Sequence, residues 1–194
     1  MENLYLAKSN PEKTIKSHTQ DLLNQLKILE EIYPFILSKE NWELLDYAVK
    51  YHDLGKINTK FQNKLYKILG KKLLEDNIEG EEIPHNFLSP YFINVDKMEE
   101  KYGREKTKIL VSSVYYHHAR EEKEITEEVK EEILKDLEKQ KENLGTFFDL
   151  DLSKIEDSIG RYILKEKDTE ILKSKDYILI KGLLNKLDYI ASLD

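Results

Sequence analysis

Apolar residues recur at three- and four-residue spacing along nearly the whole chain, and this helical period constrains the fold more than any other feature. No segment alternates apolar and polar residues convincingly, as a half-buried strand would. The chain has 194 residues, of which seven are Gly, four are Pro and 36% are charged. Such usage is typical of helical proteins with solvated outer faces. We therefore predict an all-α fold, with residues 1–194 forming one domain without a clear linker or internal repeat.

Capping and breaking residues set the expected helix bounds. The first helix should span Thr14–Tyr33 before Pro34, and the second should follow Ser38 and end at Gly55. Further helices are expected over Lys60–Leu69, from near Pro84, over Arg104–His118, over Thr126–Glu142, from a capping box at Ser153–Glu156, and over Lys175–Ser192. We expect Lys71–Glu82 to be a surface loop, and the charged Thr126–Glu142 helix to be an exposed arm.

Composition and charge exclude several classes of protein. The absence of cysteine rules out disulfides, thiolate zinc sites and cysteine nucleophiles. Residues Met1–Lys8 lack the parts of a signal peptide, and no apolar stretch approaches the roughly 20 residues of a membrane helix, so we expect a cytoplasmic protein without a membrane partner.

The formal net charge of −7 argues against a broad basic surface for nucleic acid. It leaves room for an enzyme that cuts nucleic acid, because bound divalent ions supply positive charge that the count omits. An acidic nuclease would need a partner to deliver its substrate.

The chain's five histidines fall on or beside apolar helical stripes, and none lies in the charged segments. They are His18, His52, His85, His117 and His118. A single buried histidine bonded to a carbonyl is commoner than a metal ligand. Five together, two of them adjacent, favour a shared cation, because neutral imidazole is the commonest metal ligand in proteins.

Two aspartates are placed to join these histidines. Asp53 directly follows His52, and adjacent residues of a helix point about 100° apart, so both can meet one ion only near a helix end, where Gly55 lies. Asp188 shares the apolar face of the Lys175–Ser192 helix, where an unpaired carboxylate is costly. A buried salt bridge explains Asp188 equally well at this stage.

The His52-Asp53 doublet followed by Gly55-Lys56 resembles the signature of the HD phosphohydrolase superfamily, an all-α fold. The full set of motifs resembles the HD nuclease domain of the CRISPR-associated helicase–nuclease of type I systems. The matching segments are Ser17-His18-Thr19, His52 through Lys56, His85 through Ser89, Tyr116-His117-His118, and Gly182 through Ser192 with Asp188 at its acidic position. The chain departs at Asn185, where many members carry a histidine or basic residue, but this position points away from the stripe that holds Asp188.

The resemblance implies a ligand set for two metal ions. One would be held by His18, His52, Asp53 and Asp188, and the other by Asp53, His85, His117 and His118, with Asp53 bridging. Two ions roughly 3.5–4 Å apart can activate a water and stabilise both oxygens of a phosphodiester displacement. Histidine-rich ligation favours manganese, iron, cobalt or nickel over magnesium.

Lys56 is expected to act with Asp53 in catalysis by offsetting charge that builds on the phosphate. Its alternative is a surface lysine after a helix end. Ser89 and Ser192 either support the ligand shell or simply pack between helices. Tyr115 and Tyr116 are expected to pack in the core.

The resemblance implies a nuclease that cuts single-stranded DNA in CRISPR interference, with a helicase and an RNA-guided surveillance complex as partners. The chain has no Gly-x-x-x-x-Gly-Lys-Ser/Thr loop of its own, so we expect either a separate subunit or a domain cut from a helicase fusion. The first alternative is a phosphohydrolase of small nucleotides, such as deoxynucleotide triphosphates or cyclic nucleotides. The second is a catalytically silent binding module, which loss of a ligand would support, but no candidate ligand is missing.

Overall fold

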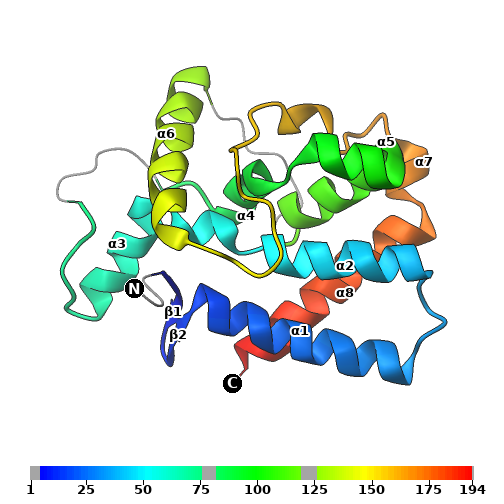
Figure 1. Cartoon of the computed structure of the whole chain (residues 1–194), viewed down its shortest axis with the longest axis horizontal. Helices are drawn as coiled ribbons and strands as arrows, with labels where there is room; N and C mark the ends of the chain where they lie inside the picture. The colour runs from blue at the N-terminus through cyan, green and yellow to red at the C-terminus, as the bar shows by residue number, and fades with distance from the viewer. Residues whose placement is uncertain (1–4, 76–81, 119–125, 194) are drawn as a thin grey trace.

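The computed structural model describes residues 5–75, 82–118 and 126–193 (Figure 1). The α-helices in these parts of the chain are α1 (Ile15–Ile32), α2 (Lys39–Tyr51), α3 (Thr59–Ile68), α4 (His85–Leu88), α5 (Val95–Tyr115), α6 (Glu127–Leu144), α7 (Thr169–Leu172) and α8 (Lys175–Ser192). Short 3₁₀ helices are η1 (Leu54–Ile57), η2 (Ser89–Phe92) and η3 (Ile159–Arg161). The all-α class is confirmed. None of the helices described is long and apolar enough to cross a membrane.

Four helices, α1, α2, α5 and α8, pack against one another and enclose the main hydrophobic core (Figure 1). Each contributes fully buried side chains, such as Leu22 of α1, Leu45 of α2, Leu110 of α5 and Leu184 of α8. Burial of these apolar faces against each other holds the four helices in fixed positions. Polar residues on the same buried faces are therefore fixed as well.

The capping residues define several helix starts as expected. The side chains of Thr14, Ser38 and Ser174 each accept a hydrogen bond from the backbone N–H three residues further along. These bonds satisfy N–H groups that have no partner within the helix. The bounds of α1, α3 and α8 agree with the sequence prediction to within one or two residues.

A β-hairpin precedes α1, and the sequence pattern did not predict it. Strand β1 (Leu6–Ser9) pairs antiparallel with β2 (Glu12–Thr14), which runs directly into α1. Gln62 of α3 anchors the hairpin, because its side-chain amide accepts from Leu6 N–H and donates to Leu6 C=O, both at 2.9 Å. Strands of four and three residues are too short to show alternation, which is why the pattern gave no signal.

Helix α5 is longer than expected and is kinked. It begins at Val95 instead of Arg104, and Gly103 interrupts it with φ 79° and ψ 165°. The side chain of Asn94 caps the first segment, whose charged surface hid its helical period in the sequence. The helix ends at Tyr115, so His118 lies just beyond the helix and not within it.

One other helix prediction fails. The Ser153–Glu156 segment is not helical, because Ser153 N–H bonds to the Asp151 carboxylate and Glu156 instead accepts from Ser158 N–H and Oγ. The helix expected from near Pro84 does form, as the single turn of α4, and η2 follows it directly. Half of the predicted Lys71–Glu82 loop, residues 76–81, lies outside the described residues.

Helix α6 forms where predicted but does not extend as an exposed arm. Its Ile133, Leu137 and Gln140 side chains are buried. The Asp136 carboxylate accepts hydrogen bonds from Asn58 Nδ2 at 2.7 Å and from Thr59 N–H at 2.9 Å. Helix α6 therefore stabilises the connection between η1 and α3, close to the His52-Asp53 doublet.

Gly55 does not end α2 in the way predicted, since it lies inside η1 after a turn at His52 and Asp53. A Cβ at this position would lie 2.2 Å from the backbone oxygen of His85 and 2.7 Å from the backbone nitrogen of Ser89. The residue must be glycine because η1 packs directly against the backbone of α4. This contact sets the distance between Asp53 and His85.

We expect Gly55→Ala to lower the free energy of unfolding by about 1–3 kcal/mol or more, because backbone atoms must move to admit the methyl group. The matched control is Gly182→Ala in α8, where the added Cβ meets nothing within 4 Å. That change should stabilise the protein by about 1 kcal/mol through helix propensity. Urea unfolding of both variants checks the pair, and equal stabilities would contradict the close-packing argument.

Candidate metal centre

The structure brings together all the predicted ligand residues at one end of the helical core. His18 comes from α1, His52 and Asp53 from the end of α2, His85 from α4, His117 and His118 from beyond the end of α5, and Asp188 from α8. All of them are buried except His85, which is partly buried, and His118, which is the most exposed. Their convergence from five helices depends on the packing described above.

His18, His52 and Asp188 form the first group of ligand atoms. The His18 Nε2 atom lies 3.0 Å from Asp188 Oδ1, and His52 Nε2 lies 3.7 Å from the same oxygen. Each residue offers one donor atom, and these atoms all lie within 4.8 Å of one another. The three donors can therefore reach a single cation.

His85, His117 and His118 form the second group, whose donor atoms also lie within 4.8 Å of one another. The ring centroids of His117 and His118 are 4.1 Å apart, and those of His85 and His118 are 5.1 Å apart. An all-imidazole set suits a divalent transition metal better than magnesium.

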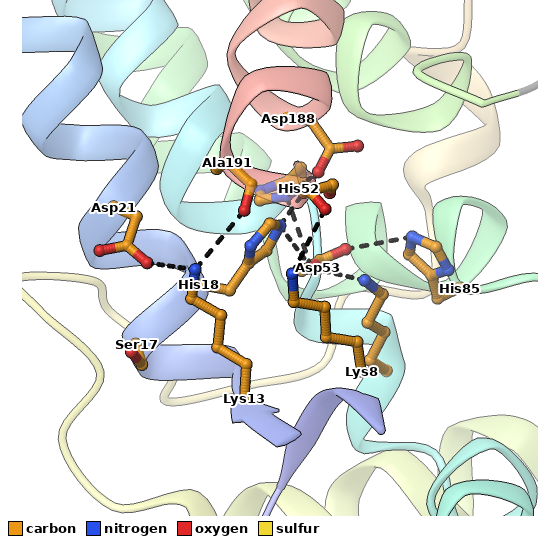
Figure 2. A network of polar contacts seen from close by, with 12 residues as sticks. Lys8, Lys13, Ser17, His18, Asp21, His52, Asp53, His85, Asp188 and Ala191 are labelled. Atoms are coloured by element: carbon orange, nitrogen blue, oxygen red, sulfur yellow. Dashed lines mark hydrogen bonds and ion pairs between the residues drawn. The ribbon is translucent and has the colours of Figure 1, made fainter. Parts of the chain in front are cut away.

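Asp53 lies between the two groups and directs one carboxylate oxygen toward each (Figure 2). Its Oδ2 atom is 3.7 Å from His18 Nε2 and 3.5 Å from His52 Nε2. Its Oδ1 atom is 3.1 Å from His85 Nε2. The carboxylate therefore contacts histidines of both groups.

Backbone carbonyls fix the tautomers of two histidines. The Nδ1 atom of His52 lies 2.7 Å from Val49 C=O, and Nδ1 of His117 lies 2.6 Å from Val114 C=O. A carbonyl can only accept, so each Nδ1 must carry the proton, and each Nε2 keeps its lone pair for a metal. Both histidines sit at a helix C-terminus, where carbonyls lack a partner within the helix.

The donor set fits a divalent metal. Among the described residues, His52 Nε2, His117 Nε2 and Asp53 Oδ1 are buried and make no hydrogen bond. Leaving such atoms unpaired is costly, and metal binding by the two ligand groups would remove that cost.

Burial keeps part of the histidine cluster neutral. It lowers the pKa of His85 to about 4, and burial together with His85 and His52 lowers the pKa of His117 well below its ordinary value. Burial also disfavours the charged form of His52, but Asp53 and Asp188 outweigh it and raise the pKa of His52. Neutral imidazole is the form that binds metal.

Both carboxylates remain ionised despite their burial. Desolvation favours the protonated form of Asp53, but His52 and Lys56 outweigh it and hold its pKa well below the ordinary value. Asp188 behaves in the same way, with His18 and His52 lowering its pKa against the effect of burial.

Lys56 is part of the site and not a surface lysine. Its side chain is 12% exposed, and its ammonium donates to Asp53 Oδ2 at 2.7 Å. The ammonium also lies 5.9 Å from the centre of the Phe61 ring.

Two polar residues hold the ligand-bearing turns. Ser89 Oγ donates to His52 C=O at 2.5 Å and accepts from Gly55 N–H at 2.8 Å, which supports the ligand shell. Asn86 Nδ2 donates to Tyr115 C=O at 2.7 Å and ties α4 to the end of α5. Asn86 was not predicted as a functional residue, although a polar residue beside Phe87 and Leu88 in an apolar stretch is a usable signal.

The remaining sequence-predicted residues have simpler roles. Ser192 contributes its backbone carbonyl, which accepts from Lys8 Nζ at 3.3 Å. Tyr115 and Tyr116 are buried in the core, as predicted.

A helical bundle that gathers histidines and aspartates around a His-Asp doublet defines the class as HD-type metal-dependent hydrolases. The chain belongs to the family described as Cas3, HD domain, whose model matches residues 6–194. The fold is similar to that of a solved structure, the CRISPR-associated Cas3 HD domain protein MJ0384 from Methanocaldococcus jannaschii. That comparison has a TM-score of 0.56 at 19% identity and covers 96% of this chain and 98% of the other. No curated protein matches the chain.

The lowered pKa of His85 predicts a pH dependence for the metal-free protein. The folded state resists protonation of His85 until the pH approaches about 4, whereas the unfolded chain takes up that proton near 6.5. Unfolding therefore binds a proton in this window, and stability falls as the pH falls. His85 alone should contribute a loss of about 2 kcal/mol between pH 7 and pH 5. Urea unfolding in the presence of a chelator should show that His85→Asn loses less stability over this pH range than the wild-type protein. An unchanged dependence of the free energy of unfolding on pH would contradict the assignment to His85.

Proposed function

We propose that the protein is a metal-dependent nuclease that hydrolyses phosphodiester bonds of single-stranded DNA in CRISPR interference, with residues 1–194 acting as one HD nuclease domain. The observation that carries the proposal is the position of Asp53, with one oxygen 3.5 Å from His52 and the other 3.1 Å from His85. The family match supports a hydrolase of the HD type.

The proposed site holds two divalent ions. His18, His52, Asp53 and Asp188 would hold one, and Asp53, His85, His117 and His118 the other. When bound, the pair would supply Lewis acidity and an activated water for displacement at phosphorus. The predominance of imidazole donors favours manganese, iron, cobalt or nickel over magnesium.

The chain's own residues set where the substrate enters. The side chains of His18 and His52 are at most 2% exposed, so they form the closed floor of the site. The His118 side chain is 45% exposed, which places the opening on its side. Lys56 offers its ammonium to a phosphate oxygen that approaches Asp53, and thereby offsets the charge that develops during displacement.

The net charge of the chain and its similarity to a CRISPR-associated protein support the partners that we propose. A net charge of −7 is poorly suited to capturing long nucleic acid unaided. The similar solved protein is named as CRISPR-associated. We propose a helicase and an RNA-guided surveillance complex, which open the duplex and present a single strand to the site.

Lys56→Gln should lower kcat for DNA cleavage by about 10²–10³-fold, the usual cost of removing one donor that stabilises transition-state charge. Metal content should stay at the wild-type value, because Lys56 is not a ligand. Lys67→Gln on the exposed face of α3 is the matched control and should retain activity. Wild-type kcat in the Lys56 variant would remove this residue from the proposed mechanism.

The deciding experiment offers circular single-stranded DNA to metal-stripped protein resupplied with manganese, nickel or magnesium. We expect cutting with manganese or nickel, and none in Asp53→Ala, since this change removes the ligand common to both groups. A deoxynucleotide triphosphate and a cyclic nucleotide are tested in parallel. Hydrolysis of only these small nucleotides would overturn the nuclease proposal and leave the HD assignment in place.

A further inference from the structure

Two lysines of the β-hairpin stand directly opposite each other beside the metal centre. Lys8 of β1 pairs with Lys13 of β2 in the antiparallel register. Directly opposed like charges destabilise a hairpin. The two lysines therefore do not stabilise the hairpin itself. Their ammonium groups must be stabilised by contacts outside it.

Both side chains reach the end of α8 that carries Asp188 (Figure 2). Lys13 Nζ lies 3.5 Å from Ala191 C=O, and Lys8 Nζ lies 3.3 Å from Ser192 C=O. These carbonyls follow Asp188 by three and four residues, which is about one helical turn. The lysines therefore flank the ligand cluster on the side next to His18.

The carbonyl contacts leave capacity to bind an anion. An ammonium has three N–H donors, and both distances exceed the usual 2.7–3.2 Å of such bonds. Within the described residues, Lys8 has the Ser192 carbonyl as its hydrogen-bond partner. Lys13 is more fully engaged, because Asp21 Oδ2 lies 2.5 Å from its ammonium.

We propose that Lys8 and Lys13 bind backbone phosphates of the single strand next to the phosphate that is cleaved, and so position the strand over the metal centre. With Lys56 they form a local basic rim on a chain of net charge −7. The inference rests on the proposed function and adds to it the residues that hold the substrate strand. A purely structural alternative is that the two lysines cap the last carbonyls of α8.

The test measures binding of fluorescein-labelled oligothymidylate to manganese-loaded protein by stopped-flow anisotropy, before cleavage sets in, at several salt concentrations. Each phosphate contact with a single strand contributes a slope of about −0.7 to log K against log salt. Lys8→Gln and Lys13→Gln should each reduce the slope by about that amount and weaken binding at low salt about 5- to 10-fold. Lys27→Gln, an exposed change on α1, is the control and should leave the slope unchanged.

Asp21→Asn separates strand binding from helix capping. Removing this carboxylate frees the Lys13 ammonium, so strand affinity should rise if Lys13 binds phosphate. If the lysines only cap α8, their variants lose thermal stability while the salt slope stays at its wild-type value, and Asp21→Asn gives no gain. Those results, or a failure of the wild-type protein to bind the strand, would overturn the inference. Binding that depends on both lysines without any cutting would support the inference and count against the nuclease proposal alone.

Discussion

The buried carboxylate of Asp53 is the constraint on which the rest of the structure depends. A charge in this position must be met by cations or donors, since its desolvation is otherwise too costly. His18 and His52 approach one side of it, His85 approaches the other, and Lys56 bonds to Oδ2. The close contact of η1 with α4 at Gly55 and the hydrogen bonds of Ser89 hold that carboxylate in position.

Helix ends provide the geometry that helix interiors cannot. Adjacent residues within a helix diverge, yet His52 and Asp53 reach the same centre because α2 ends at Tyr51 and the chain turns there. His117 and His118 do the same beyond α5. At both ends a backbone carbonyl accepts a hydrogen bond from Nδ1–H and leaves Nε2 to face the centre, so termination of the helix also orients the ligand.

The sequence predicted the structure well wherever burial requires apolar residues to recur at helical spacing over several turns. Helix α8 and its buried aspartate could be predicted because apolar residues recur over five turns, and the histidines stood out because they lie on such stripes. The β-hairpin could not be predicted, because its strands are too short for a period and Gln62, which anchors it, is distant in sequence. The Ser153–Glu156 segment misled because its capping residues bond to Asp151 and Ser158 instead of to each other. The position of Lys8 and Lys13 beside α8 could not be predicted either, because it depends on tertiary contacts.

The contact between His18 and Asp188 spans 170 positions of the chain. During synthesis the amino-terminal helices emerge first. The first ligand group gains its carboxylate only when α8 has been made and has packed against α1, α2 and α5. An incomplete chain thus lacks a finished centre, so any hydrolytic activity appears only with the completed fold.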